Sequence, residues 1–406
     1  MLPRPDRAPS STERIRAHAR APARARNLLM IAYTGLLISL PLAAIALKTQ
    51  HARYIHAYFV ASGFLTTIGL GALFFVLLHH LVNARWSLVA CRQMQWVANL
   101  LPWCSLLFLP NLLWAREIFP WVNSDAASKL AEVDHIGYLR APWFFARTAV
   151  YFAVWTALTW GYKNQKIPSK DTVESERHAQ RCRRMSGPAM LVFGVTTTFA
   201  SFDWFMSLQP NWHSAVFGVY IFAGSVPAAL SALALFNVLL ERSGVIRSNE
   251  NVMSRHDIAK LLFGFIVFWA YIAFSQYLLI WYAGIPLETS FFSLRLSQPW
   301  LSSTLWLFAL QFAVPFVLLL SATAKRSPLV LALASLVVLL AHALDIFWLV
   351  MPALESGHSR LCFADAAAAL LPVSAVMLLF AKGLENESRI PQEADNSATF
   401  EPILTL

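Results

Sequence analysis

Residues 202–210 read FDWFMSLQP and place a carboxylate, Asp203, in a segment that is otherwise apolar enough to span a membrane. A looser copy, LDIFWLVMP, occupies residues 344–352 and carries Asp345. In both copies a phenylalanine follows the acid by two residues and a proline follows it by seven. The copies lie 142 residues apart, a separation of four apolar segments. Unless this match is a coincidence, it predicts two four-helix units in one orientation, each ending in a helix with an acid near the same membrane face.

The composition is that of an integral membrane protein. Of the 406 residues, 57% are hydrophobic and 13% are charged, and the mean hydropathy is +0.53, so nucleic acid is a poor candidate partner. The four cysteines are scattered and form no motif for covalent haem, zinc or an iron–sulfur cluster; they are Cys91, Cys104, Cys182 and Cys362. We therefore expect no metal and no bound cofactor in this chain, and any redox centre belongs to a partner.

Ten apolar segments are long enough to cross a ~30 Å hydrocarbon core as helices. The fold class that they predict is an all-α integral membrane protein with about ten transmembrane helices. The predicted segments are 27–47, 56–82, 95–116, 143–162, 187–208, 215–240, 260–282, 302–322, 328–349 and 364–381.

The distribution of positive charge predicts the orientation of these helices. With the N-terminus inside, the cytoplasmic segments hold 24 of the 32 Lys and Arg residues, so both termini are predicted to be cytoplasmic. The predicted organisation is a disordered basic arm at the anionic membrane surface, a ten-helix domain and a disordered acidic tail. Their bounds are 1–26, 27–382 and 383–406, with bundle one at about 56–208, bundle two at about 215–349 and outer helices at about 27–47 and 364–381.

Five polar residues are predicted to gather in the outer half of the membrane: Asp203, His342, Asp345, Gln276 and Arg147. Ionisable groups at bilayer depth are expensive, so they are read as functional by default. His342 and Asp345 are i, i+3 on one helix and share a face, which suits proton transfer because histidine titrates near neutrality. The alternatives are a structural His–Asp hydrogen bond, and an ion pair of Arg147 with an aspartate that only locks two helices.

Further polar residues could extend a wire of hydroxyls and water from these acids, although hydroxyls in membrane helices more often bond the backbone or a neighbouring helix. They are Thr196 and Ser207 in the fifth predicted span, Tyr271, Ser275 and Tyr282 in the seventh, and His79 and His80 at the cytoplasmic mouth. In the second span Gly63, Thr67 and Gly71 form a stripe of small residues that predicts close helix packing.

Two long stretches resemble a known family. Residues 201–214, SFDWFMSLQPNWHS, with 217–220, FGVY, and residues 268–289, FWAYIAFSQYLLIWYAGIPLET, are similar to motifs of the F-type membrane subunit of bacterial alternative complex III. That complex is a quinol:cytochrome c oxidoreductase, and its large membrane subunits are polysulfide-reductase-like (NrfD-like). The family often has two acids after the proline of the second stretch, whereas here Leu287 precedes the single Glu288, which weakens any role that needs an acid pair there.

The resemblance implies two four-helix bundles and two outer helices in the inner membrane of a bacterium. It also implies partners: a sister NrfD-like subunit, an iron–sulfur subunit and subunits with several haems c. The leading hypothesis is a non-haem subunit that transfers protons on Asp203, His342 and Asp345. The alternatives are a quinone site in this chain, with Trp269 and Trp281 as candidate walls, a stand-alone proton-coupled secondary transporter, and a structural anchor.

Overall fold

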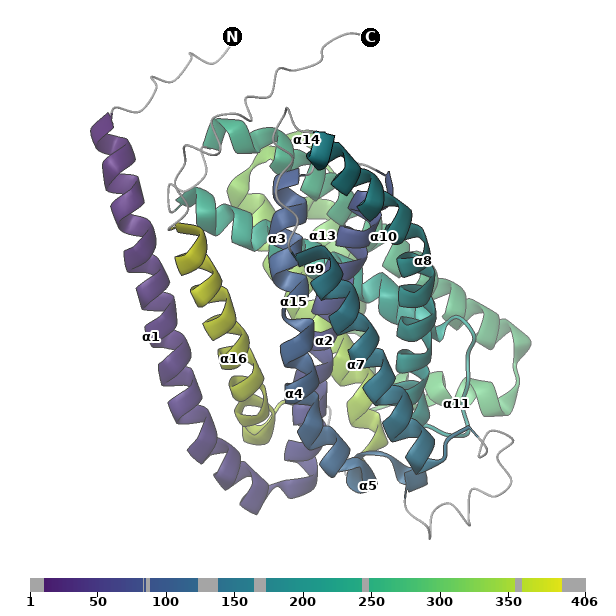
Figure 1. The fold of residues 1–406 in the computed structure, drawn as a ribbon. Coiled ribbons are helices and arrows are strands. Elements are labelled where there is room, and N and C mark those ends of the chain that lie inside the picture. Colours follow the sequence, from purple (N-terminus) through teal and green to yellow (C-terminus); the bar gives the residue numbers. More distant parts are fainter. Residues whose placement is uncertain are drawn as a thin grey trace.

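The computed structural model describes residues 11–82, 84, 88–122, 138–163, 173–242, 248–354 and 360–388. All regular structure in this part of the chain is helical (Figure 1). The long helices are α1 (Ser11–Thr49), α2 (His51–Val82), α7 (Ala141–Lys163), α8 (Val173–Trp204), α9 (Phe217–Arg242), α10 (Ser248–Ala283), α15 (Pro328–Val350) and α16 (Phe363–Ser388). The shorter ones are α3 (Leu88–Ala98), α4 (Leu101–Leu113), α5 (Ala115–Ile118), η2 (Pro120–Val122), η3 (Met206–Leu208), α11 (Pro286–Arg295), α12 (Leu301–Phe308), η4 (Ala309–Ala313), α13 (Val314–Leu318), α14 (Ala322–Arg326) and η5 (Met351–Ala353).

Eight helical segments of the described chain are long and apolar enough to cross a membrane, which confirms the predicted all-α membrane class. Two predicted spans fall outside this set. They are α7, and α16, whose apolar part is the shorter segment Phe363–Leu378. The predicted third span consists of α3 and α4 joined at Asn99 and Leu100, and the predicted eighth is interrupted by the π-helical turn η4.

The helix ends differ from the prediction at both ends of the chain. α1 begins at Ser11, where the sequence predicted a disordered arm, because residues 11–26 consist largely of alanine and arginine, which are strong helix formers. α16 continues to Ser388, past the predicted helix end at about residue 381 and into the predicted disordered tail. Residues 1–10 and 389–406, the rest of the predicted arm and tail, lie outside the described residues.

α2 occupies the centre of the molecule and packs against α3, α4, α8, α9, α15 and α16. It belongs to a first group of helices with α3, α4, α7 and α8, and it also contacts a second group made of α9, α10, α12, α13 and α15. Gly71 makes the contact with α9 possible, since a Cβ there would meet the backbone carbonyl of Ser225 at 2.2 Å. Gly63 likewise faces Phe205, and the close packing predicted for this stripe is confirmed.

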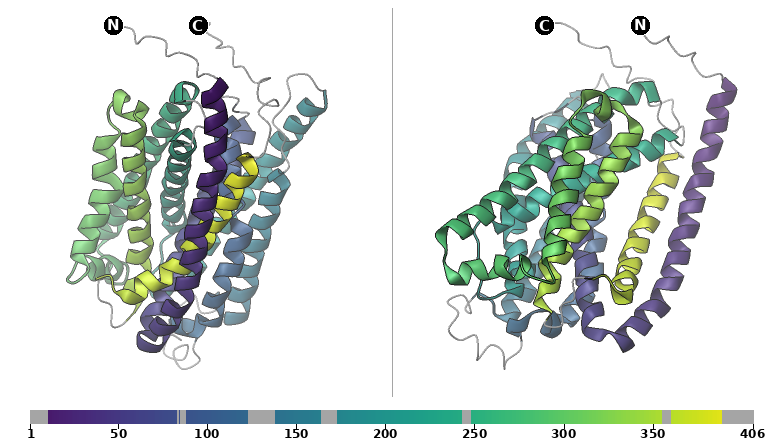
Figure 2. Two further views of the ribbon diagram at one scale, coloured as in Figure 1. Left: turned by 90° about the vertical axis from the view of Figure 1, so that its left-hand side faces the viewer. Right: turned by 180° about the vertical axis from the view of Figure 1, so that it is seen from behind.

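α1 and α16 lie side by side along one edge of the molecule (Figure 2). A Cβ on Gly35 of α1 would meet the Ser374 hydroxyl of α16 at 2.3 Å, so the two helices are in close contact. A bidentate ion pair joins this edge to the centre. The Nε and Nη2 atoms of Arg53 in α2 donate to the Asp365 carboxylate of α16 at 2.8 and 2.7 Å.

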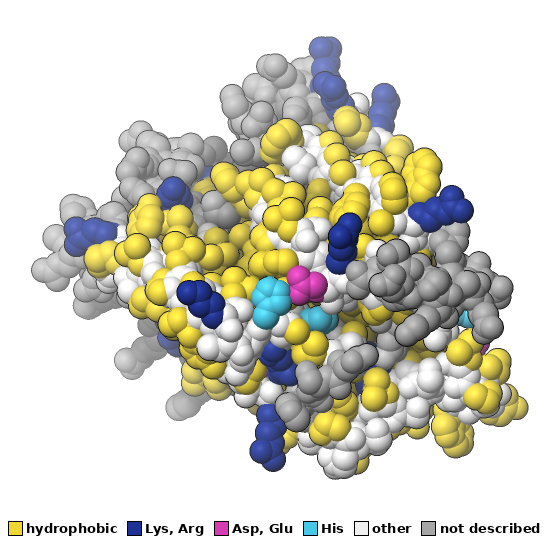
Figure 3. Space-filling view, turned by 90° about the horizontal axis from the view of Figure 1, so that it is seen from below, with side chains coloured by type: hydrophobic (Ala, Val, Ile, Leu, Met, Phe, Trp, Pro, Cys, Tyr) yellow, Lys and Arg dark blue, Asp and Glu magenta, His cyan; other side chains and the backbone are white. Residues whose placement is uncertain are grey.

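Both copies of the repeated motif end their helices in the same way. α8 ends at Trp204 and leads into the 3₁₀ turn η3, and α15 ends at Val350 and leads into the 3₁₀ turn η5. Both helix ends lie at the end of the molecule where α5 and α11 are found (Figure 1). Seen from this end, the surface is largely hydrophobic, with acidic and histidine side chains together near its centre and basic ones scattered around them (Figure 3).

Candidate functional site

Asp203 is fully buried in the last turn of α8 and is held by α7. Arg147 donates from Nε to Oδ2 at 2.9 Å and from Nη2 to Oδ1 at 2.8 Å, and the Tyr151 hydroxyl donates to Oδ2 at 2.7 Å. Because Arg147 and Tyr151 are i, i+4 on α7, one helix face supplies all three donors. The arginine and the phenol thus bond both oxygens of the Asp203 carboxyl group.

Tyr138 completes this first site. The Arg147 guanidinium lies 3.9 Å from the centre of the Tyr138 ring, and its Nη1 donates to the Tyr138 carbonyl at 3.1 Å. Burial and the nearby Asp203 raise the pKa of Tyr138, so it remains a neutral phenol. The charge of Asp203 is thus matched by one cation, and the arrangement ties α7 to α8.

Asp345 is 2% exposed and sits near the end of α15. The Tyr220 hydroxyl of α9 donates to its Oδ1. No arginine or lysine of the described chain forms an ion pair with it. Asp345 is therefore a buried carboxyl whose bonded partner is a neutral phenol.

His342 lies one turn before Asp345 on the same face of α15, and it is also buried. Its Nε2 is 2.8 Å from the Thr67 hydroxyl, which itself donates to the carbonyl of Phe64. The imidazole therefore donates from Nε2, and in its neutral form Nδ1 is an acceptor. Nδ1 has no partner within the described chain.

Gly224 of α9 brings the two groups together. A Cβ built on this glycine would lie 3.2 Å from His342 Nδ1 and 3.5 Å from Asp345 Oδ2. The free nitrogen and the second carboxyl oxygen thus face the same small space at the backbone of α9. Buried polar atoms are nearly always hydrogen-bonded, so an unpartnered one is informative. A lone pair on Nδ1 beside a carboxyl group can accept a proton from it.

More buried polar atoms without a partner lie in the second helix group. They belong to side chains that are at most 1% exposed, namely Ser231 and Asn237 of α9, Gln311 of η4 and Ser335 of α15. Along α9 the distance from Tyr220 to Asn237 is roughly 25 Å at 1.5 Å per residue. These atoms are candidates to bind ordered water, which usually satisfies such groups. They extend from the Asp345 region toward the opposite end of the molecule.

Four of the polar residues predicted to extend the wire are bonded locally or face outward. Thr196 donates to the backbone of its own helix and accepts from Trp155, and Ser207 donates to the Asp203 carbonyl. Tyr271 and Tyr282 are 65% and 84% exposed on the outside of α10.

The remaining predicted residues are more dispersed. Gln276 is buried and Ser275 is half-buried on α10, and the Glu288 carbonyl accepts from Trp212 Nε1 at 3.1 Å. His79 and His80 lie in the last turn of α2, at the end remote from His51, with the His80 ring stacked on Tyr162. Trp269 is buried and Trp281 is 64% exposed, so these two rings do not form the walls of one pocket.

Sequence reasoning missed Tyr151, Tyr220, Gly224 and Arg295. The first had a signal, since Tyr151 follows Arg147 by four residues and shares its helix face. Tyr220 stands in the FGVY stretch, but its partner Asp345 lies 125 residues away. Arg295 lies between the seventh and eighth predicted spans, yet it is 1% exposed. For the last three residues, only the packing of distant helices reveals the role.

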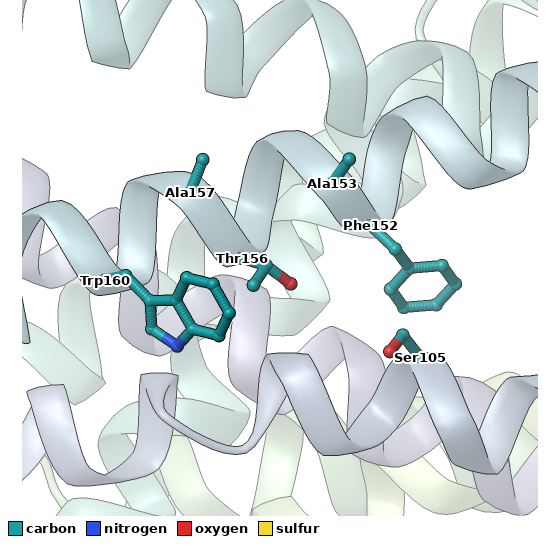
Figure 4. Close-up of a pocket in the computed structure, with 6 residues that line it drawn as sticks. All are labelled: Ser105, Phe152, Ala153, Thr156, Ala157 and Trp160. Carbon is teal, nitrogen blue, oxygen red and sulfur yellow. The ribbon is translucent and has the colours of Figure 1, made fainter.

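A shallow depression of about 360 Å³ lies between α4 and α7 (Figure 4). Ser105, Phe152, Ala153, Thr156, Ala157 and Trp160 line it. The Ser105 hydroxyl donates to the carbonyl of Pro102, so the lining offers little polar chemistry. This depression includes none of the predicted site residues. Within the described part of the chain, no three His, Cys, Asp or Glu side chains are grouped as a metal site would need.

The sequence was compared with known proteins. No protein-family model and no curated protein matches it.

Proposed function

We propose that this chain is a proton-transferring membrane subunit of a respiratory quinol:cytochrome c oxidoreductase, with Asp345 and His342 as the groups that carry the proton. The observation that carries the proposal is the environment of Asp345 and His342, which together form the second site. Asp345 is buried with a phenol as its bonded partner, and the free Nδ1 of His342 faces the same space at Gly224. A carboxyl without a bound cation can take up and release a proton, whereas one held by arginine cannot do so readily.

The step itself is simple. Asp345 in its acid form gives a proton to His342 Nδ1, which leaves a carboxylate that Tyr220 stabilises and an imidazolium that Thr67 holds through Nε2. The reverse step restores both neutral groups. Water bound along Ser231, Ser335, Gln311 and Asn237 would connect this pair to the opposite end.

The topology that fits this role has ten spans in two four-helix bundles, with α1 and α16 outside them and both termini cytoplasmic. The helix order and the positive charge of the connecting segments on one side support it. The partners in the proposal are the sister membrane subunit, the iron–sulfur subunit and the haem c subunits, which would hold the redox centres. The resemblance of the two long motifs is what supports them.

The test compares Asp345→Asn with Asp203→Asn in the complete complex in membranes. We expect Asp345→Asn to lower the number of protons that reach the outer side of the membrane per electron, while electron transfer to cytochrome c continues. Asp203→Asn should chiefly weaken the contact of α7 with α8. Unchanged proton stoichiometry in both variants would refute the role. Purification of the chain from its native membrane without haem absorbance would instead favour a stand-alone proton-coupled transporter.

A further inference from the structure

Basic side chains gather where α10 meets α14, at the end of the molecule opposite to α11 (Figure 1). His256 and Lys260 stand one turn apart on the same face of α10, and Lys325 and Arg326 form the last turn of α14. The His256 ring is close enough to Lys260, Lys325 and Arg326 to interact electrostatically with all three. Two helices thus bring together three cations and an imidazole, and we call these four residues the basic cluster.

The positive charge of the basic cluster is only partly matched within the described chain. Lys260 Nζ donates to Asp257 Oδ1 at 3.3 Å. Among the described residues, no carboxylate forms an ion pair with Lys325 or Arg326. Three cations therefore face one carboxylate, which leaves an excess of positive charge that a bound anion can match.

Two contacts show that the basic cluster is anchored between the helices. Lys325 Nζ lies 4.4 Å from the centre of the Phe263 ring, a cation–π contact that joins α14 to α10. Phe263 is itself stacked on Phe316 of α13, with ring centres 5.2 Å apart. The Nδ1 atom of His256 is shielded from solvent and has no partner within the described chain. Such atoms are rare, so this nitrogen points to a bound ligand or water.

The N-terminus of α15 adds backbone donors next to these cations. Arg326 is followed directly by Ser327, the N-cap of α15, whose hydroxyl makes no capping bond. The N–H groups of Leu329 and Val330, in the first turn, have no intrahelical acceptor. The positive end of the helix dipole and its free N–H groups favour phosphate. Both the cations and the helix end therefore suit an anion with several oxygens.

The basic cluster lies at the level where the helices leave the hydrocarbon core. The apolar segment of α10 is Arg255–Ala283, and that of α12 to α13 is Leu301–Leu318. From Lys260 an exposed stripe runs along one face of α10 toward the middle of the membrane, at the spacing of a single helix face. It consists of Gly264, Val267, Tyr271 and Phe274. Nothing lies within 4 Å of a Cβ on Gly264, so the stripe is open directly below the cation.

We propose that the basic cluster and the N-terminus of α15 bind the phosphate headgroup of an anionic phospholipid, whose acyl chains lie along the exposed stripe of α10. Basic pockets between transmembrane helices at a membrane surface are typical sites for such headgroups. The phosphate supplies the negative charge that the cluster lacks, and the chains cover the apolar surface that begins at Lys260. This site lies at the opposite end of the molecule from Asp345 and does not depend on the proposed function.

The test measures lipid binding to the full chain, purified in detergent with the subunits that accompany it, by native mass spectrometry. The probes are phosphatidylglycerol, which is anionic, and phosphatidylcholine with the same acyl chains, which is zwitterionic. We expect phosphatidylglycerol to bind more tightly. Lys325→Gln combined with Arg326→Gln should weaken its tightest site about 25-fold, because each cation near the surface contributes about fivefold. Arg183→Gln combined with Arg184→Gln, an exposed basic pair on α8 outside the cluster, should leave that site unchanged.

Equal binding of the two lipids overturns the inference, as does an equal loss in the control pair on α8. Inorganic phosphate separates a lipid site from a site for a free anion. It should not displace phosphatidylglycerol at equal concentration because it has no acyl chains, and complete displacement overturns the lipid assignment. If the double variant on α14 does not fold, Lys260→Gln, which alters an exposed side chain, should weaken binding about fivefold. An unchanged affinity in that variant also overturns the inference.

Discussion

Asp203 and Asp345 show that a repeated residue can acquire two different chemistries from its partners. Both are buried at the same end of parallel helices and both accept from a tyrosine hydroxyl. Arg147 makes a bidentate pair with the first, whereas no arginine or lysine of the described chain pairs with the second. Removing one partner from a buried pair is costly because the other charge is left uncompensated. Asp203 is therefore suited to holding helices together, and Asp345 to proton exchange.

The space at Gly224 gives a prediction at the residue scale. A Cβ there would lie 3.2 Å from the His342 ring, which is tighter than an ordinary contact, so Gly224→Ala should push the imidazole away from Asp345. We expect fewer protons per electron to reach the outer side of the membrane, while thermal stability falls by about 1–3 kcal/mol from overpacking. Gly264→Ala is the control, because nothing lies within 4 Å of a Cβ at that position of α10. A normal stoichiometry in Gly224→Ala would mean that the imidazole is not needed at this spot.

At the scale of elements, the two repeated segments end their helices alike, and both place a phenylalanine against α2. Phe205 packs against Phe59 of α2, and Phe347 packs against Trp300 and under the Arg53 guanidinium of α2. α2 thereby receives the same aromatic side chain from both motifs. A 3₁₀ turn follows each helix, η3 before Pro210 and η5 around Pro352. The shared pattern of acid, phenylalanine and proline thus marks the end of a helix that packs against α2.

The contact of α7 with α8 is predicted to depend on the Arg147–Asp203 pair. Arg147→Met leaves a buried carboxylate without its cation and should lower stability by about 3–5 kcal/mol, since breaking one side of a buried pair has that cost. Adding Asp203→Asn removes the stranded charge and should recover much of the loss. Thermal unfolding of the purified complex measures both effects. Additive losses in the double variant would show that the two residues do not act as a pair.

Features that depend on residues close together in the sequence could be predicted, whereas contacts between helices far apart in the chain could not. Hydropathy and helical spacing predicted the membrane helices, the buried acids and the shared face of His342 and Asp345, because these depend on neighbours within a few residues. The pairing of Asp345 with Tyr220, and of Arg295 with the carbonyls at the end of α15, depends on packing between helices far apart in the chain. For Tyr271, the local spacing led to a wrong prediction. It has the spacing of a buried polar stripe, but it is 65% exposed on α10.

At the scale of the whole molecule, the orientation in the membrane decides on which side a proton leaves Asp345. The helices α2, α7 and α9 end on the side of the molecule where α14 lies, and α11 with the motif ends lies on the other (Figure 1). The bias of Lys and Arg predicts that the first end faces the cytoplasm. The Asp345 end then faces outward, and a proton released there contributes to the gradient.

Cysteine labelling tests this orientation directly. Cys91, Cys104 and Cys182 are buried, so only the half-buried Cys362 needs replacement before single cysteines are introduced. Ser290→Cys in α11 and Thr49→Cys at the end of α1 should react with a membrane-impermeant maleimide in intact cells, because both positions are exposed at the Asp345 end. Thr323→Cys in α14 and Arg184→Cys in α8, exposed at the opposite end, should react only after permeabilisation. Labelling of the second pair in intact cells would invert the topology, and Asp345 would then exchange protons with the cytoplasm.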